Sequence, residues 1–151
     1  MMIPKDILYK VSLDVVIGTT NVQINDIQFD SRAIQKGGVF VALKGTVVDG
    51  HEYIEKAVSL GAKAIILEEL PDYQEEQVTY IKVKNTHNAL ALIAANFYQN
   101  PSRDLKLVGV TGTNGKTTTT SLLYQLFKKS GFKTGLISTV EILIDEKVVS
   151  T

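Results

Sequence analysis

Residues 107–120 read Leu107-Val108-Gly109-Val110-Thr111-Gly112-Thr113-Asn114-Gly115-Lys116-Thr117-Thr118-Thr119-Thr120. A short apolar run leads into a glycine-rich loop, and the loop leads into a segment with helical character. Glycines let backbone N–H groups turn toward an anion, and the start of a helix adds unpaired N–H groups and the positive end of its dipole. This order predicts a P-loop, with Lys116 on the β- and γ-phosphates and the Thr117 hydroxyl on Mg²⁺.

The loop departs from the general pattern G-x-x-x-x-G-K-[ST] at one position. The pattern requires glycine five residues before Gly115, where this chain has Val110; Gly109 lies one residue earlier. The alternative is a turn between a strand and a helix that holds no ligand. A lysine beside three loop glycines serves no packing purpose, so we interpret the stretch as a narrower pattern, G-x-x-G-T-x-G-K-T. The expected ATP-binding residues are Gly112, Thr113, Asn114, Gly115, Lys116, Thr117 and Thr118, whereas Thr119 and Thr120 are expected to be structural.

Composition narrows the class of protein. A hydrophobic content of 44% with 21% charged residues is typical of a folded globular chain rather than a disordered one. Lys+Arg and Asp+Glu both number 16, so no net charge attracts nucleic acid or an anionic membrane. The absence of cysteine excludes disulfides, thiolate zinc sites and cysteine nucleophiles. His51 and His87 are too few for a histidine-based metal site and are weak candidates for a catalytic base.

Targeting signals are absent from the sequence. The first residues lack the basic start and apolar core of a signal peptide, and no apolar run reaches the length of a membrane span. We therefore expect a cytoplasmic protein with no nucleic-acid partner and no membrane insertion, and a monomer is the working expectation.

Alternating strands and helices in the first hundred residues predict an α/β domain. Val39 to Leu43 is a continuous apolar run, typical of a strand buried on both faces. Ile27 and Phe29 alternate with polar residues, which predicts a half-buried strand. The other expected strands are 64–67 and 80–83, with short extended pieces at 15–18 and 22–24. The expected helices are 5–11, 51–60 and 89–98, the last well covered because it is apolar on nearly every side.

A domain boundary is expected at residues 100–104, where Pro101 ends a helix. We assign residues 1–102 to the first domain and 103–151 to the start of a second. The second would contain a strand at 105–110, the loop, a helix at 117–130 and a strand at 133–138, forming one βαβ unit, and then a hairpin at 142–149. The helix would pack through Leu122, Leu123, Leu126 and Phe127. One such unit cannot bury both faces of a parallel sheet, so the second domain is expected to be incomplete in this sequence.

Two separated segments together resemble the Mur ligase family, the ATP-dependent amide-forming enzymes of peptidoglycan precursor synthesis. The first contains Asp30-Ser31-Arg32, the run 37–45 (GGVFVALKG) and Asp49-Gly50-His51; the second is the run 109–119 (GVTGTNGKTTT). The order of these motifs is similar to that of the MurE-type branch, and the resemblance covers nearly the whole chain. MurF-type ligases share a similar first segment but usually differ in the loop. Folylpolyglutamate synthases share the loop style but lack Asp-Ser-Arg.

The resemblance implies a UDP-muramoyl-peptide-binding N-terminal domain, followed by the beginning (β–P-loop–α–β) of a Rossmann-like ATPase domain and, further on, an amino-acid-binding domain. It places Phe29 and Ser31 in the uridine pocket, and Thr46, Val47 and Val48 in the loop that contacts the nucleotide. The alternative for Ser31 is a turn residue at a strand end. Asp30 and Arg32 are interpreted as a local turn and ion pair. Asp49 and His51 are expected to shape the loop and cap the following helix.

The implied activity is amide formation through an acyl phosphate. ATP phosphorylates the D-Glu carboxylate of UDP-MurNAc-L-Ala-D-Glu, and the amine of a diamino acid then attacks. Such phosphoryl transfer depends mainly on positioning and on neutralisation of charge. In this chain Lys116 and Thr117 would be the catalytic residues that do both, with ATP and Mg²⁺ as cofactors. Meso-diaminopimelate is expected rather than L-lysine, only because ligases of this family that add diaminopimelate are the more widespread. The residues that complete catalysis would lie beyond Thr151, so these 151 residues alone are expected to be inactive.

Three alternatives remain open at this point. The chain could be a UDP-sugar-binding module without catalysis, a MurF-type ligase, or a different P-loop enzyme such as a kinase. The last is disfavoured by the absent glycine at position 110 and by the lack of a later carboxylate-bearing strand.

Overall fold

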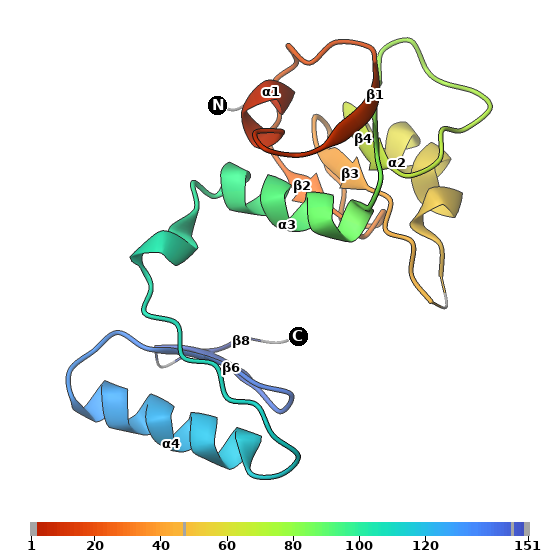
Figure 1. Cartoon of the computed structure of the whole chain (residues 1–151). Helices are drawn as coiled ribbons and strands as arrows, with labels where there is room; N and C mark the ends of the chain where they lie inside the picture. The colour runs from red at the N-terminus through yellow and green to blue at the C-terminus, as the bar shows by residue number, and fades with distance from the viewer. Residues whose placement is uncertain (1–2, 47, 146, 150–151) are drawn as a thin grey trace. The chain divides into compact units, whose positions relative to one another are not determined.

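The computed structural model describes residues 3–46, 48–145 and 147–149. The chain divides into two compact units, Met1–Leu105 and Lys106–Thr151 (Figure 1). In the described part of the chain, no helix combines the length and the apolar character that a membrane span requires.

The first unit is built on a five-stranded sheet with strand order β1-β5-β4-β3-β2. Its strands are β1 (Leu13–Ile17), β2 (Ile27–Gln28), β3 (Val39–Val41), β4 (Ala64–Leu67) and β5 (Thr79–Val83). Strands β2 to β5 pair in parallel, with Phe40 opposite Ile65 and Ile65 opposite Tyr80, whereas β1 lies antiparallel to β5 at the edge. The predicted mixed α/β class is confirmed.

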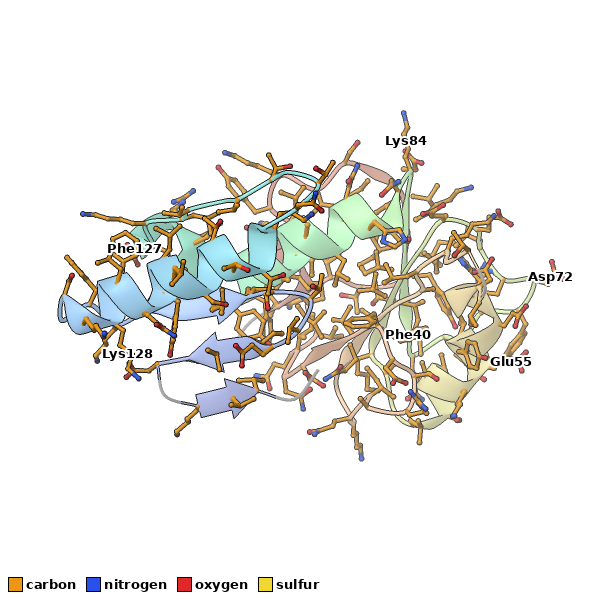
Figure 2. All side chains as sticks on the ribbon, turned by 90° about the horizontal axis from the view of Figure 1, so that it is seen from below. Phe40, Glu55, Asp72, Lys84, Phe127 and Lys128 are labelled. Carbon is orange, nitrogen blue, oxygen red and sulfur yellow. The ribbon has the colours of Figure 1, made fainter. Side chains whose placement is uncertain are left out.

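Helices cover both faces of this sheet, which is why β3 and β4 are apolar at every position. Alternate residues point to opposite faces and form two core clusters. Helices α1 (Pro4–Ile7) and α3 (Thr86–Phe97) cover one face, and α2 (Ile54–Ser59) covers the other (Figure 1). The cluster under α3 contains Val39, Val41, Ala64, Ile66, Ile81, Val83, Ala89 and Ile93; the cluster under α2 contains Phe40, Ile65, Leu67, Tyr80, Ile54 and Ala57. Figure 2 shows Phe40 inside this unit, with Glu55 and Lys84 pointing away from it.

Several predicted element boundaries in the first unit shift. The helix expected at 51–60 is a 3₁₀ turn, η1 (Gly50–Tyr53), followed by α2, and the first helix ends at Ile7. Strand β2 ends at Gln28, so Phe29 is 61% exposed instead of half-buried, because the turn that begins at Asp30 stops the pairing with β3. Helix α3 is less covered than expected, since Leu92 is 41% exposed.

The 3₁₀ turn η2 (Pro101–Asp104) leads out of the first unit, and the second unit contains α4 (Lys116–Lys129) and a three-stranded antiparallel sheet. The strands are β6 (Gly135–Ile137), β7 (Ile142–Ile144) and β8 (Lys147–Val149), so the predicted hairpin is confirmed. Helix α4 packs through Tyr124, whose hydroxyl donates a hydrogen bond to the Asp145 carbonyl.

Three expectations for the second unit are wrong. Residues 105–110 form no strand, and Leu107 is 91% exposed, because a strand needs a hydrogen-bonded neighbour and the described residues supply none. The expected βαβ unit is therefore not formed, since β6 pairs antiparallel with β7. The predicted apolar face of α4 is also largely uncovered, with Leu122 61% and Leu126 58% exposed, because a three-stranded sheet covers only part of the helix.

Candidate nucleotide sites

The glycine-rich loop presents backbone donors at the start of α4. Gly115 precedes the helix with a φ of +75°, a left-handed conformation that glycine adopts readily. The Thr119 N–H donates to the Gly115 carbonyl at 2.9 Å, whereas the N–H groups of residues 116–118 find no acceptor among the described residues. Three N–H groups and the positive end of the helix dipole therefore point to one place, which is the arrangement that binds an anion.

Lys116 folds back over this loop. Its Nζ donates to the Gly112 carbonyl at 2.5 Å and to the Thr113 carbonyl at 3.3 Å, so the exposed ammonium group already lies at the loop. The hydroxyls of Thr117 and Thr118 make no hydrogen bond to the described part of the chain. The Thr120 hydroxyl donates to the carbonyls of Lys116 and Thr117 at 3.0 Å each, which is consistent with the structural role expected of it.

The loop also leaves room for a ligand. A Cβ added at Gly109 or Gly115 would meet no heavy atom within 4 Å, and one at Gly112 would meet only the Asn114 carbonyl oxygen, at 3.8 Å. Residues 112–118, the predicted ATP-binding residues, are all exposed and contiguous. No three metal-binding side chains gather among the described residues. The donors present fit a nucleotide phosphate chain, and Mg²⁺ would be shared between Thr117 and the phosphates, as is usual for this ion.

Ser31 combines burial with an unused hydroxyl. The residue is 5% exposed, and its hydroxyl bonds to no described residue. No fully buried side-chain oxygen in the described part of the chain lacks a hydrogen-bond partner, so the unbonded Ser31 hydroxyl keeps some contact with solvent, where a ligand can reach it. The exposed Phe29 ring belongs to the same short segment.

The neighbouring Asp30 forms the predicted local turn and ion pair. Its Oδ1 accepts from the Arg32 N–H at 2.9 Å, and its Oδ2 lies 2.7 Å from Arg32 Nη2. Hydrogen bonds from the Arg32 side chain and backbone lower the pKa of Asp30 to about 2. This turn fixes the backbone on either side of Ser31.

The segment 44–50 is a tight loop after β3. Lys44 and Asp49 form an antiparallel bridge, the Gly45 N–H donates to the Val48 carbonyl at 3.1 Å, and the Gly50 N–H donates to the Leu43 carbonyl at 2.8 Å. A Cβ on Gly50 would lie 2.7 Å from the Leu43 nitrogen, so only glycine fits there. At the tip, Thr46 and Val48 are exposed, and Val47 lies outside the described residues.

Both candidate uridine segments follow neighbouring parallel strands. Phe29 and Ser31 come after β2, and residues 44–48 come after β3, which pairs in parallel with β2. The carboxyl ends of adjacent parallel strands meet at one edge of a sheet, and ligands of open α/β sheets bind at this edge. The topology therefore brings the predicted uridine residues to the same edge.

A hydrogen-bond network ties the 44–50 loop to the end of β4. Asp49 Oδ1 accepts from the His51 N–H at 2.9 Å and lies 2.6 Å from His51 Nδ1. His51 Nε2 accepts from the Glu68 N–H at 2.9 Å and from the Glu69 N–H at 3.3 Å. The predicted capping role of Asp49 is confirmed. The connection to residues 68 and 69 is not among the predictions, because no local pattern relates His51 to a segment seventeen residues further along the chain.

The same network reaches α3. The Glu68 carboxylate accepts from both the N–H and the hydroxyl of Thr86 at 2.8 Å, and these hydrogen bonds lower the pKa of Glu68. Lys44 forms an exposed ion pair with Glu69 at 3.0 Å, and the His87 ring lies 3.3 Å from the Lys44 carbonyl oxygen.

Comparison with known proteins finds two family matches. Residues 23–98 match the family described as "Mur ligase family, catalytic domain", and residues 110–151 match the "Mur ligase middle domain". The UDP-N-acetylmuramoyl-L-alanyl-D-glutamate--2,6-diaminopimelate ligase of Cytophaga hutchinsonii is 54% identical over 146 residues, which cover 96% of this chain and 30% of that protein. The protein of the same name from Phocaeicola vulgatus is 49% identical, with the same coverage of both chains. The chain spans about 30% of the length of these curated relatives.

Solved structures agree with this similarity. A UDP-N-acetylmuramoyl-L-alanyl-D-glutamate--2,6-diaminopimelate ligase aligns with a TM-score of 0.71 over 97% of this chain and 29% of its own, at 20% identity, which supports the fold alone. MurF from Acinetobacter baumannii aligns with a TM-score of 0.64 at 26% identity, over 84% of this chain and 27% of its own. MurF from Thermotoga maritima in complex with ADP aligns with a TM-score of 0.56 at 37% identity, over 70% and 23%.

Proposed function

The chain belongs to the Mur ligase family, and on that premise we propose that it is the first part of an ATP-dependent ligase that adds meso-diaminopimelate to UDP-MurNAc-L-Ala-D-Glu. The observation that carries the proposal is the open loop before α4, with its free N–H groups and Lys116, in a chain 54% identical to a ligase of that name. The product would be a peptidoglycan precursor.

Residues 1–102 would bind the UDP-muramoyl peptide, and residues 103–151 would begin the ATPase domain. The Ser31 hydroxyl, which bonds to no described residue, would bond the uracil or ribose, and the exposed Phe29 ring belongs to the same segment. The backbone amides of the loop that contains Thr46, Val47 and Val48 would read the uracil edge. We also propose that the complete protein acts in the cytoplasm as a monomer.

The loop before α4 would hold the phosphates of ATP. The N–H groups of residues 116–118 and the Lys116 ammonium would neutralise charge on the phosphate oxygens, and the Thr117 hydroxyl would share Mg²⁺ with them. When bound, ATP supplies the phosphoryl group that activates the D-Glu carboxylate for attack by the amine. Lys116 would first exchange its hydrogen bonds to the Gly112 and Thr113 carbonyls for bonds to phosphate.

An assay of the complete protein tests this proposal. Purified protein is incubated with MgATP, UDP-MurNAc-L-Ala-D-Glu and either meso-diaminopimelate or L-lysine, and phosphate release and product mass are measured. Turnover with meso-diaminopimelate is expected. Phosphate release only with L-lysine would refute the amino-acid assignment, and UDP binding without any phosphate release would indicate a binding module.

A MurF-type ligase is the second candidate, because MurF structures align at 26% and 37% identity. Such an enzyme would be inactive with the dipeptide substrate and active when a UDP-MurNAc-tripeptide and D-Ala-D-Ala are supplied. The names of the curated relatives favour the first candidate.

A further inference from the structure

The side chain of His51 joins two segments that are distant in the sequence. Its Nδ1 lies 2.6 Å from Asp49 Oδ1 within the 44–50 loop, and its Nε2 accepts from the Glu68 N–H at 2.9 Å just after β4. We propose that His51 is a positioning residue for nucleotide binding, which holds the loop 44–50 in the conformation that receives the UDP moiety. The inference rests on the proposed function, since it takes this loop to contact the nucleotide.

The hydrogen-bond partners determine which ring nitrogen carries the proton. Nε2 faces two backbone N–H groups, those of Glu68 and Glu69, so it must present a lone pair. Nδ1 faces a carboxylate oxygen of Asp49, so it must be the donor. In this tautomer both ring nitrogens are used, and the rigid imidazole sets the separation between the loop and the end of β4.

The other interactions that hold the loop in place are local or exposed, among them the exposed His87 ring of α3, which lies 3.3 Å from the Lys44 carbonyl oxygen. Within it, the Gly45–Val48 and Gly50–Leu43 backbone hydrogen bonds define the turn but do not attach it to β4. The Lys44–Glu69 ion pair does connect the same segments, but its side chains are 51% and 73% exposed, and exposed pairs contribute little. The His51 side chain is only 15% exposed. His51 is therefore the least exposed side-chain link between the loop and the end of β4.

Fixing the loop before binding should raise affinity. The tip at Thr46 and Val48 is exposed, so a loose loop would lose conformational freedom each time a nucleotide bound. The link through His51 removes part of that entropy loss in advance. Its loss should therefore weaken UDP binding more than it weakens the fold.

Calorimetric titration of the 151-residue chain with UDP tests the proposal on three variants. Asparagine in His51→Asn keeps a donor near Asp49 but is too short to reach the Glu68 N–H, so affinity should fall about tenfold. Glutamine in His51→Gln places an oxygen near the Nε2 position, so affinity should stay within about threefold of wild type. Asn96→Ala removes two hydrogen bonds, to the Ile7 and Tyr9 carbonyls, outside the 44–50 loop, and should lower thermal stability without changing UDP affinity.

Amide hydrogen exchange at residues 45–50 gives a second reading that does not depend on UDP, and it should be faster in His51→Asn than in wild type. If His51→Asn had wild-type UDP affinity and unchanged exchange, this inference would be overturned while the proposed function would stand. Equal loss of affinity in His51→Asn and Asn96→Ala would also overturn it, because His51 would then act only through stability. A wild-type chain that binds no UDP would refute the proposed nucleotide site, and this inference with it.

Discussion

Replacing Glu68 by alanine should destabilise the first unit strongly, although Glu68 belongs to none of the helices or strands. Its carboxylate receives two hydrogen bonds of 2.8 Å from Thr86, a residue that is fully buried at the start of α3. The alanine variant leaves the Thr86 N–H and hydroxyl without their acceptor, and it removes a negative charge from a helix N-terminus. The variant loses two hydrogen bonds to a charged group, and water that enters the site replaces part of them. The free energy of unfolding should therefore fall by about 2–3 kcal/mol.

The pH dependence of this effect has a definite sign. The hydrogen bonds from Thr86 lower the pKa of Glu68 in the folded chain below its ordinary value of 4.5. A lowered carboxyl pKa stabilises the folded state above the unfolded value, and this contribution is lost as the pH falls through the folded value. The difference in the free energy of unfolding between wild type and Glu68→Ala should therefore be largest at neutral pH and become smaller below about pH 4.5.

Amide hydrogen exchange of Ile66 and Ile81 measures the opening of the first unit separately from the second, because both residues lie in its core. Glu69→Ala is the matched control, since Glu69 is the adjacent carboxylate but forms only an exposed ion pair with Lys44. That variant should match wild type. Equal exchange in Glu68→Ala and Glu69→Ala would refute the reasoning.

Three further predictions concern the candidate sites. In the complete ligase, Lys116→Ala should lower turnover by more than about 10²-fold with near-normal UDP-substrate binding, and retained turnover in a phosphate-release assay would contradict the role of Lys116. Ser31→Ala should weaken UDP binding about fivefold without affecting ATP binding, and calorimetry that finds equal loss of both would contradict the division into two domains. The pKa of the Asp30 carboxyl, measured by NMR, should be about 2. The stabilisation from the Asp30–Arg32 ion pair should therefore be fully present above pH 3.8, the ordinary pKa of aspartate, and be lost as the pH falls through about 2. A midpoint near 3.8 would show that the ion pair does not form in solution.

Local patterns were enough to predict the parts of the molecule that depend on neighbouring residues. The apolar runs at 39–43 and 64–67 contain the buried strands β3 (Val39–Val41) and β4, since only a sheet covered on both faces needs apolar residues at every position. The seven residues from Gly112 to Thr118 form an open turn and the first residues of α4, because glycine spacing and the helix start are both local properties. Whether that turn binds ATP stays a prediction.

Contacts between distant segments could not be predicted in the same way. The antiparallel edge strand β1 and the burial of Ser31 follow from how the whole sheet assembles. The strand expected at residues 105–110 depended on a partner that the described chain does not supply, and apolar composition alone cannot create that partner.

By itself, the sequence determined the α/β class, the family resemblance and the position of the phosphate-type loop, because strand burial, helix starts and glycine spacing are properties of short segments. Only the tertiary structure decided how the candidate uridine loop is held. His51 bonds backbone groups seventeen and eighteen residues further along the chain, and Glu68 bonds Thr86 another eighteen residues on. These hydrogen bonds exist because β4 and α3 bring the segments together, which no local pattern records.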